Sequence, residues 1–190
     1  MPSPIRFQKV FSFVDVRAAL AEIERQPELW GEITLRQTYP GTAHADTETI
    51  FIRGPSSPAG AFDEVPAHFY PAVEKLPECS HLVSLLAESL NAKELGRVMV
   101  VKLKAGGHIA PHVDEGKYAE HYERFHFVLD SDEGNVFQCA DRIEWMKPGT
   151  AWWFDHRVEH SVTNASARDR IHLIVDLVTP QFAPARGAWS

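Results

Sequence analysis

The sequence predicts a mainly β fold, an antiparallel jelly roll with supporting α-helices in the N-terminal half. Three observations predict it: seven short segments with the alternation of strands lie between Arg97 and Val178, turn residues separate them, and two helical stripes precede them. Short strands at this spacing favour an antiparallel sheet, because parallel strands need long crossover connections that this stretch does not contain.

The composition fits one globular domain. The chain has 190 residues, of which 44% are hydrophobic and 24% are charged. We expect residues 1–190 to form this domain in three parts. Residues 1–95 supply helical and loop support with edge strands, residues 96–180 form the jelly-roll core, and residues 181–190 are a tail.

The N-terminal half contains elements of both kinds. Apolar residues at helical spacing predict two helices, the first ended by Pro27, and alternation predicts two strands. A stretch of glycine, proline and serine predicts a loop, which we interpret as a lid. In chain order these elements are the helix Val16–Ile23, the strands Ile33–Tyr39 and Thr49–Arg53, the loop Gly54–Pro58 and the helix His81–Leu95.

The second half reads as strands separated by turns. Glycine, proline and asparagine mark the turns, and the turn near Ala165 predicts that the last two strands form a hairpin. The strands expected are Arg97–Lys104, Tyr122–Leu129, Val136–Ala140, Ile143–Met146, Ala151–Phe154, Val158–Thr163 and Arg170–Val178.

Charge and hydropathy exclude several classes of protein. A net charge of −7, from 19 basic and 26 acidic residues, disfavours nucleic acid and anionic membranes as partners. No apolar run exceeds four residues, whereas a membrane helix needs about 20, and the N-terminus lacks a signal-peptide pattern. We therefore expect a soluble, cytoplasmic monomer or homodimer in which Cys79 and Cys139 are buried thiols. The sequence has no phosphate loop, dinucleotide fingerprint, zinc motif or nucleophile elbow.

Seven of the ten histidines fall between residues 108 and 172. His112 and Asp114 lie at i and i+2, so in an extended segment both side chains leave the same face. His160, in a segment that alternates as a strand does, is the candidate third ligand. Two histidines and a carboxylate on one triangular face are the ligand set of non-haem Fe(II) oxygenases. A His-x-Asp pair alone is weak, because most single histidines are structural or exposed.

Cationic side chains are predicted to lie near these ligands. Arg170 follows His160 across the predicted hairpin, where it can clamp a carboxylate through two hydrogen bonds. Arg124 and His126 share one face of their strand, and apolar residues occupy the other. If helices cover the apolar face, Arg124 and His126 line the same cavity as the metal ligands.

These residues, at these spacings, resemble the aspartyl/asparaginyl β-hydroxylase family of Fe(II)- and 2-oxoglutarate-dependent oxygenases, which includes bacterial proline cis-4-hydroxylases. The similar stretch runs from about Arg97 to Pro180. The motifs that carry the resemblance are Gly107–His112, Arg124-Phe125-His126, Trp153-Phe154-Asp155, His160-Ser161-Val162 and Arg170–Asp176.

The resemblance implies a double-stranded β-helix that uses Fe(II), 2-oxoglutarate and O₂ to hydroxylate a C–H bond, with release of succinate and CO₂. The iron ligands that it implies are His112, Asp114 and His160. The 2-oxoglutarate-binding residues that it implies are Arg124, His126 and Arg170. The animal aspartyl hydroxylases have a glycine at the position of Asp114 and a serine at that of Val101. The free-proline hydroxylases keep the carboxylate, as this chain does.

The pattern says less about the substrate, which we expect to be an amino acid or a side chain of a peptide or protein. Arg97 lies near the position at which related proline hydroxylases have a carboxylate-binding arginine, and Trp153 can form an apolar wall. Arg36 and Arg53 are further candidates. Histidines interpreted as structural or exposed are His44, His68, His121 and His156. The alternative is a cupin-like isomerase or metal-binding module without oxygenase activity, which would not need cations for a cosubstrate dianion.

Overall fold

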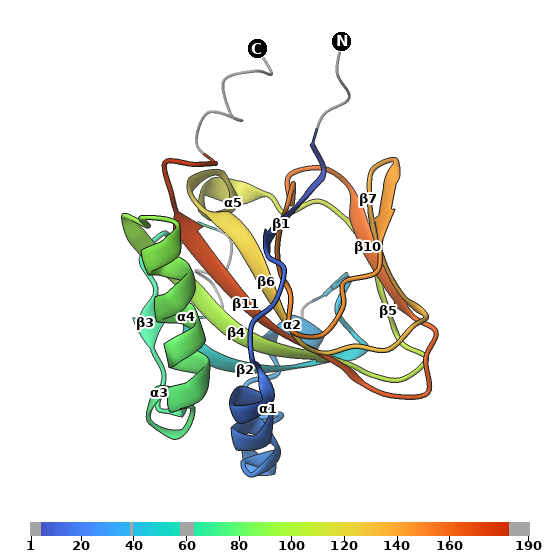
Figure 1. The fold of residues 1–190 in the computed structure, drawn as a ribbon, viewed down its shortest axis with the longest axis horizontal. Coiled ribbons are helices and arrows are strands. Elements are labelled where there is room, and N and C mark those ends of the chain that lie inside the picture. The colour runs from blue at the N-terminus through green and yellow to red at the C-terminus, as the bar shows by residue number, and fades with distance from the viewer. Residues whose placement is uncertain (1–4, 39, 58–62, 183–190) are drawn as a thin grey trace.

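A computed structural model describes residues 5–38, 40–57 and 63–182 of the chain. Its strands form two sheets, with helices mainly on one side of the larger sheet (Figure 1). The strands are β1 (Phe7–Phe11), β2 (Thr47–Gly54), β3 (His68–Phe69), β4 (Glu94–Leu103), β5 (His108–His112), β6 (Glu123–Asp130), β7 (Asn135–Cys139), β8 (Arg142–Glu144), β9 (Ala151–Phe154), β10 (His160–Asn164) and β11 (Arg170–Val178). The helices are α1 (Arg17–Glu24), a 3-10 turn η1 (Pro27–Leu29), α2 (Leu35–Thr38), α3 (Ala72–Lys75), α4 (Pro77–Ser89) and α5 (Gly116–His121).

The two sheets are antiparallel. The larger has the order β1-β9-β6-β11-β4-β2-β3, and the smaller has the order β5-β10-β7-β8. Every strand pair in the described part of the chain runs antiparallel. The predicted fold class, a mainly β jelly roll with N-terminal helices, is confirmed.

Helices α1 and α4 cover one face of the larger sheet. Ile23 and Leu86 from the helices are buried together with Phe125, Phe127 and Leu173 from β6 and β11. Each such side chain contributes roughly 1.5–3 kcal/mol through burial. The prediction that the apolar face of β6 packs outward against helices is therefore confirmed, and its polar face turns toward the smaller sheet.

A second apolar cluster fills the space between the sheets. Leu103 and Val128 from the larger sheet pack with Phe137 and Val162 from the smaller sheet. The polar side chains between the sheets lie beside this cluster: both Arg170 and His126 are in contact with the ring of Phe137.

The predicted strand Ile33–Tyr39 is wrong. Leu35–Thr38 forms the short helix α2, in which the Thr34 carbonyl accepts from the backbone N–H groups of Gln37 and Thr38. Tyr39 lies outside the described residues. The alternation of this segment suited a strand, but the backbone hydrogen bonds of Leu35–Thr38 are local, and none of these four residues pairs with a sheet edge.

The predicted hairpin between the last two strands is also wrong, because β10 belongs to the smaller sheet and β11 to the larger. The expected helix His81–Leu95 is α4, which begins earlier, at Pro77, and ends at Ser89. Asn91 then has φ +49°, a left-handed conformation that turns the chain toward β4. The short or edge elements β1, β3, β5, α3 and α5 were not predicted.

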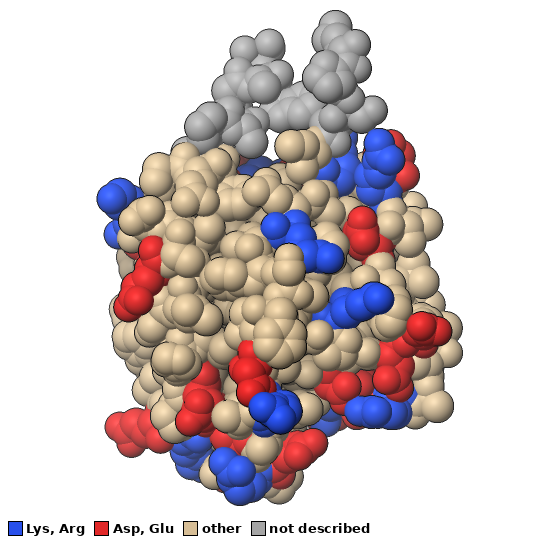
Figure 2. Space-filling view, in the orientation of Figure 1, with Lys and Arg blue, Asp and Glu red and all other residues tan. Residues whose placement is uncertain are grey.

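Surface charge is mixed on the face shown in Figure 2, where Lys and Arg side chains alternate with Asp and Glu rather than forming one basic field.

No helix in the described ranges is long and apolar enough to cross a bilayer. Cys79 and Cys139 are free and buried, as predicted. The predicted lid is described up to Ser57, and most of the predicted tail, residues 183–190, lies outside the described residues.

Candidate active site

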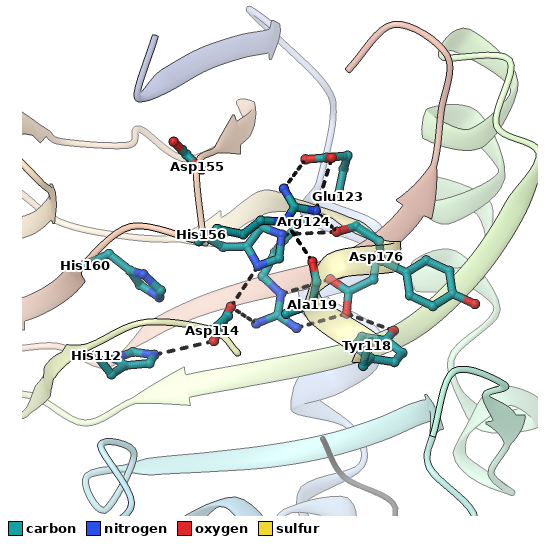
Figure 3. Close-up of polar contacts among 12 residues, drawn as sticks. His112, Asp114, Tyr118, Ala119, Glu123, Arg124, Asp155, His156, His160 and Asp176 are labelled. Atoms are coloured by element: carbon teal, nitrogen blue, oxygen red, sulfur yellow. Dashed lines mark hydrogen bonds and ion pairs between the residues drawn. The ribbon is translucent and has the colours of Figure 1, made fainter. Parts of the chain in front are cut away.

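Three candidate metal ligands converge at the mouth of the sandwich (Figure 3). The ligand atoms of His112, Asp114 and His160 all lie within 4.8 Å of one another. His112 ends β5, His160 begins β10, and the two residues are direct neighbours in the smaller sheet, with ring centroids 4.2 Å apart. Asp114 follows the end of β5, and its N–H donates to the His156 carbonyl at 3.0 Å. The structure therefore brings together the three residues that the sequence analysis selected.

Both histidines turn Nδ1 toward the backbone. The His112 Nδ1–H donates to the Ala110 carbonyl at 2.8 Å, and the His160 Nδ1–H donates to the Val158 carbonyl at 2.9 Å. Because a carbonyl only accepts, each ring keeps a proton on Nδ1, which leaves the Nε2 lone pair of the neutral ring for a metal. Burial lowers the pKa of His160 to about 4 against the opposing effect of Asp114, so this ring is neutral at pH 7.

Asp114 is fixed through one of its two oxygens. Oδ2 lies 2.6 Å from Arg124 Nη1 and 3.2 Å from His156 Nδ1, whereas Oδ1 faces His112 Nε2 at 3.8 Å. Burial would raise the pKa of Asp114, but Arg124 and His156 hold it well below its ordinary value. The carboxylate is therefore ionised, with Oδ1 available to a cation.

Arg124 is held in turn by a second carboxylate, Asp176. Its Nε and Nη2 donate to Asp176 Oδ1 and Oδ2, both at 2.9 Å, and the Tyr118 hydroxyl donates to Oδ2 at 3.1 Å. Burial would lower the pKa of Arg124, but Asp114 and Asp176 raise it above its ordinary value. The guanidinium therefore hydrogen-bonds both carboxylates, an arrangement that orients Asp114.

Arg170 lies deeper between the sheets. The residue is 3% exposed, and no acidic residue in the described part of the chain forms an ion pair with it. Its Cζ is 5.7 Å from the Phe137 ring, and the same ring is 6.3 Å from the ring of His160, so Phe137 links this pocket to the metal ligands. Burial lowers the pKa of Arg170 to about 9, so the guanidinium is charged at pH 7, and none of the described residues supplies its counter-ion. Such a site favours an anion.

Two neutral histidines accompany Arg170. Arg170 Nη2 donates to His172 Nδ1 at 2.8 Å, and His126 Nδ1 lies 3.2 Å from the same atom. Because His172 Nδ1 accepts, the proton of that ring is on Nε2. This atom is buried and has no hydrogen-bond partner in the described part of the chain, and the same holds for His126 Nε2 and Ser131 Oγ. Burial first and Arg170 second hold the pKa values of His126 and His172 well below the ordinary value. These partnerless polar atoms are available to hydrogen-bond a ligand.

A cavity of about 400 Å³ opens beside the metal ligands. His112 and Asp114 form part of its wall, and Arg97 of β4 forms another part. Arg36 of α2 and His44 of the following loop close it from the opposite element. The cavity therefore joins the metal ligands to two further arginines, both of which the sequence analysis named as substrate candidates.

The other two substrate candidates lie elsewhere. Trp153 is buried in the helical layer, where its Nε1–H donates to Glu123 at 2.9 Å, and it does not line the cavity. Arg53 donates to the Gly96 carbonyl at 3.0 Å and lies 4.7 Å from the Phe69 ring. The structure does not bring Trp153 or Arg53 to the metal ligands.

The sequence analysis did not place several residues at the site. His44 and His156 were interpreted as structural or exposed; the structure shows that His44 lines the cavity and that His156, 2% exposed, supports Asp114. Asp176 and His172 were named only as parts of a motif and a strand. Their alternation with buried apolar residues of β11 was the available signal, because a charged residue on such a strand needs a partner.

The fold and the two-histidine, one-carboxylate group define a jelly-roll protein with a candidate facial metal site. Residues 22–180 match the family model described as "Aspartyl/Asparaginyl beta-hydroxylase". The chain belongs to this family, as its resemblance implied. The match begins well before Arg97 and includes most of the half that the motifs did not cover.

Individual proteins similar to this chain are hydroxylases or oxygenases by their descriptions. The chain is 28% identical to the L-proline cis-4-hydroxylase of Rhizobium meliloti (strain 1021) over 117 residues, which are 62% of this chain and 41% of that protein. The matched region thus spans less than half of that curated relative. A 2OG-Fe(II) oxygenase family oxidoreductase from Burkholderia pseudomallei superposes with a TM-score of 0.58 at 14% identity, over 90% of this chain and 84% of that one. A prolyl hydroxylase from Trichoplax adhaerens, solved with a hypoxia inducible factor peptide fragment, gives 0.57 at 13% identity over 97% and 87%. These structural likenesses establish the fold.

Proposed function

We propose that the chain is an Fe(II)- and 2-oxoglutarate-dependent hydroxylase of a C–H bond in an amino acid or an amino-acid side chain. The overall reaction consumes the substrate, O₂ and 2-oxoglutarate and yields the hydroxylated product, succinate and CO₂. The observation that carries this proposal is the convergence of His112, Asp114 and His160 within 4.8 Å. The family and its L-proline cis-4-hydroxylase member support the reaction class.

The donor set fits Fe(II). His112 Nε2, His160 Nε2 and Asp114 Oδ1 would hold the metal, and three ligands of this kind leave three of six coordination positions open. When bound, iron and 2-oxoglutarate supply the oxidising chemistry, and the protein supplies position and the exclusion of water. Arg124 keeps Asp114 ionised and oriented throughout.

The pocket around Arg170 fits the distal carboxylate of 2-oxoglutarate. A buried guanidinium without an acidic partner among the described residues would pair with that carboxylate, and His172 Nε2–H and Ser131 Oγ would donate to it. The family resemblance also assigned Arg124 and His126 to the cosubstrate. We propose instead that Arg124 positions Asp114, and that His126 lines the cosubstrate pocket beside His172.

The test of the metal centre is spectroscopic. Anaerobic addition of Fe(II) and 2-oxoglutarate should produce the weak visible charge-transfer band of the chelate. Replacing His112 or His160 by Ala should abolish this band, because each removes one of three protein ligands. His108→Ala is the matched control, since His108 is exposed and pairs with Asp46. A band that persists in both ligand variants would refute the assignment.

The cupin-like alternative predicts metal binding without 2-oxoglutarate turnover. Succinate release, measured against free amino acids and a peptide panel with mass spectrometry for one added oxygen, separates the two hypotheses. We also propose a cytoplasmic location, which two free, buried cysteines support.

A further inference from the structure

We propose that the substrate presents a free carboxylate to Arg36, and that it is therefore a free amino acid rather than an internal residue of a polypeptide. This inference rests on the proposed function and names its substrate class. It comes from an arginine in the cavity wall that forms no ion pair with any described residue.

Arg36 points into the cavity from α2. Its Nη2 lies 3.2 and 3.3 Å from the two ring nitrogens of His44, so a neutral ring is its hydrogen-bond partner. Its Nη1 is buried and has no hydrogen-bond partner among the described residues. No carboxylate in the described ranges lies within ion-pair distance of Arg36. The Nη1 edge of the guanidinium is thus free to donate to an acceptor inside the cavity.

The two carboxylates whose charges act on Arg36, Asp114 and Asp176, are hydrogen-bonded to Arg124 instead. Asp114 is also the candidate ligand of a divalent cation. Burial first and the charge of Arg124 second lower the pKa of Arg36 to about 10 against the partial opposing effect of the two carboxylates, so the guanidinium remains charged at pH 7. An anion bound at Arg36 would offset both effects, whereas the amide of a peptide bond brings no charge.

Arg97 is a further guanidinium in the wall of the same cavity, which Arg124 also lines. It is 9% exposed and stacks 3.6 Å from the centroid of the Tyr118 ring, which fixes its orientation. Phe51 and Met99 contribute apolar surface beside it. A cavity of about 400 Å³ with cationic groups and an apolar wall fits a small acid with a hydrocarbon part.

The distance to the metal ligands limits how far the attacked carbon is from this carboxylate. One imidazole separates Arg36 from the metal site, because the His44 ring lies 4.8 Å, centroid to centroid, from the His112 ring. A carboxylate held at Arg36 therefore keeps the side-chain carbons of an amino acid near the ligands.

Binding is measured first, without turnover. Protein loaded with Zn(II) and 2-oxoglutarate is titrated calorimetrically with the common free L-amino acids, L-proline included, and with the primary amide of each. We expect at least one free acid to bind ten or more times tighter than its amide, because the site loses its charge partner in the amide. Equal binding of the acid and the amide, or no binding by any free amino acid, would overturn the proposal.

Substitutions at Arg36 test whether this residue makes the protein prefer the free acid over its amide. Arg36→Gln should reduce the acid-to-amide ratio at least tenfold, and Arg36→Lys should retain part of it. Arg142→Gln is the control, since Arg142 is exposed on β8. An unchanged ratio in Arg36→Gln would remove Arg36 from the site. The acid-to-amide binding ratio of the unsubstituted protein is measured without any variant. It therefore tests the proposal even if a variant folds poorly.

Succinate release measured with the same compounds tests the hydroxylase activity separately from the carboxylate site. Free acids that bind in an Arg36-dependent way, without supporting succinate release, would refute the hydroxylase and leave the carboxylate site standing. Release stimulated only by peptides with an internal target residue would support the hydroxylase and refute the carboxylate site.

Discussion

Replacing Arg170 by Met should stabilise the protein without cosubstrate and weaken 2-oxoglutarate binding, two effects of opposite sign from one change. The guanidinium is buried, and burial lowers its pKa to about 9. Because each tenfold change in acidity corresponds to about 1.4 kcal/mol, this lowering sets an upper limit of roughly 5 kcal/mol on the burial penalty. Methionine has a similar length and carries no charge, so a gain of about 1–3 kcal/mol is expected once its packing is considered.

The expected loss of 2-oxoglutarate affinity follows from the proposed ion pair between Arg170 and the distal carboxylate. Removing one partner of a desolvated ion pair costs roughly 2–5 kcal/mol, which is about 30-fold to several-thousand-fold in Kd at 1.4 kcal/mol per factor of ten. Urea unfolding without ligands measures the first effect, and anaerobic titration of the Fe(II)-loaded protein with 2-oxoglutarate measures the second. Arg168→Met is the control, because Arg168 is exposed and pairs with Asp130.

Either measurement can refute this reasoning. A 2-oxoglutarate Kd within threefold of the parent value would show that Arg170 does not hold the cosubstrate. A large loss of stability in Arg170→Met, with binding unchanged, would mean that the guanidinium is a structural group satisfied within the protein.

Two further predictions concern stability. The folded-state pKa values of His126 and His172 lie well below the ordinary 6.5, so both rings stay neutral when folded but take a proton when unfolded; stability is present above pH 6.5 and is lost as the pH falls below it. Between pH 7.5 and 5.5 the loss should be about 1.4 kcal/mol for each ring in urea unfolding of the metal-free protein, and His126→Phe should remove one such contribution; an identical loss in the variant would contradict this. Gly96→Ala should destabilise the protein by about 1–3 kcal/mol in thermal unfolding, because the added Cβ would lie 2.6 Å from the Tyr118 hydroxyl; an unchanged midpoint would show that the tyrosine moves freely.

The metal ligands could be predicted because their signal is local. His112 and Asp114 are two residues apart, and His160 begins a segment whose alternation marked it as a strand. The same period-two argument correctly assigned the two faces of β6, with Phe125 and Phe127 against the helices. Patterns of this kind need no knowledge of which strands are neighbours.

The pairing of distant segments could not be predicted in this way. The turn near Ala165 is real, but the chain crosses between sheets there, and a crossing leaves the same sequence signature as a hairpin. Arg36 was placed on a strand because its segment alternates, whereas the segment is a helical turn over the cavity. Its importance depends on which charges lie around it, and those come from β4, β6 and the loop after β5.

Arg124 already has two carboxylate partners in this structure. Asp114 lies 2.6 Å from Nη1, and Asp176 occupies Nε and Nη2. A cosubstrate carboxylate at Arg124 would have to displace an ionised, buried partner, which costs more than pairing with the guanidinium of Arg170, which has no acidic partner among the described residues. The complete ligand triad therefore favours Arg170 as the residue that holds the distal carboxylate.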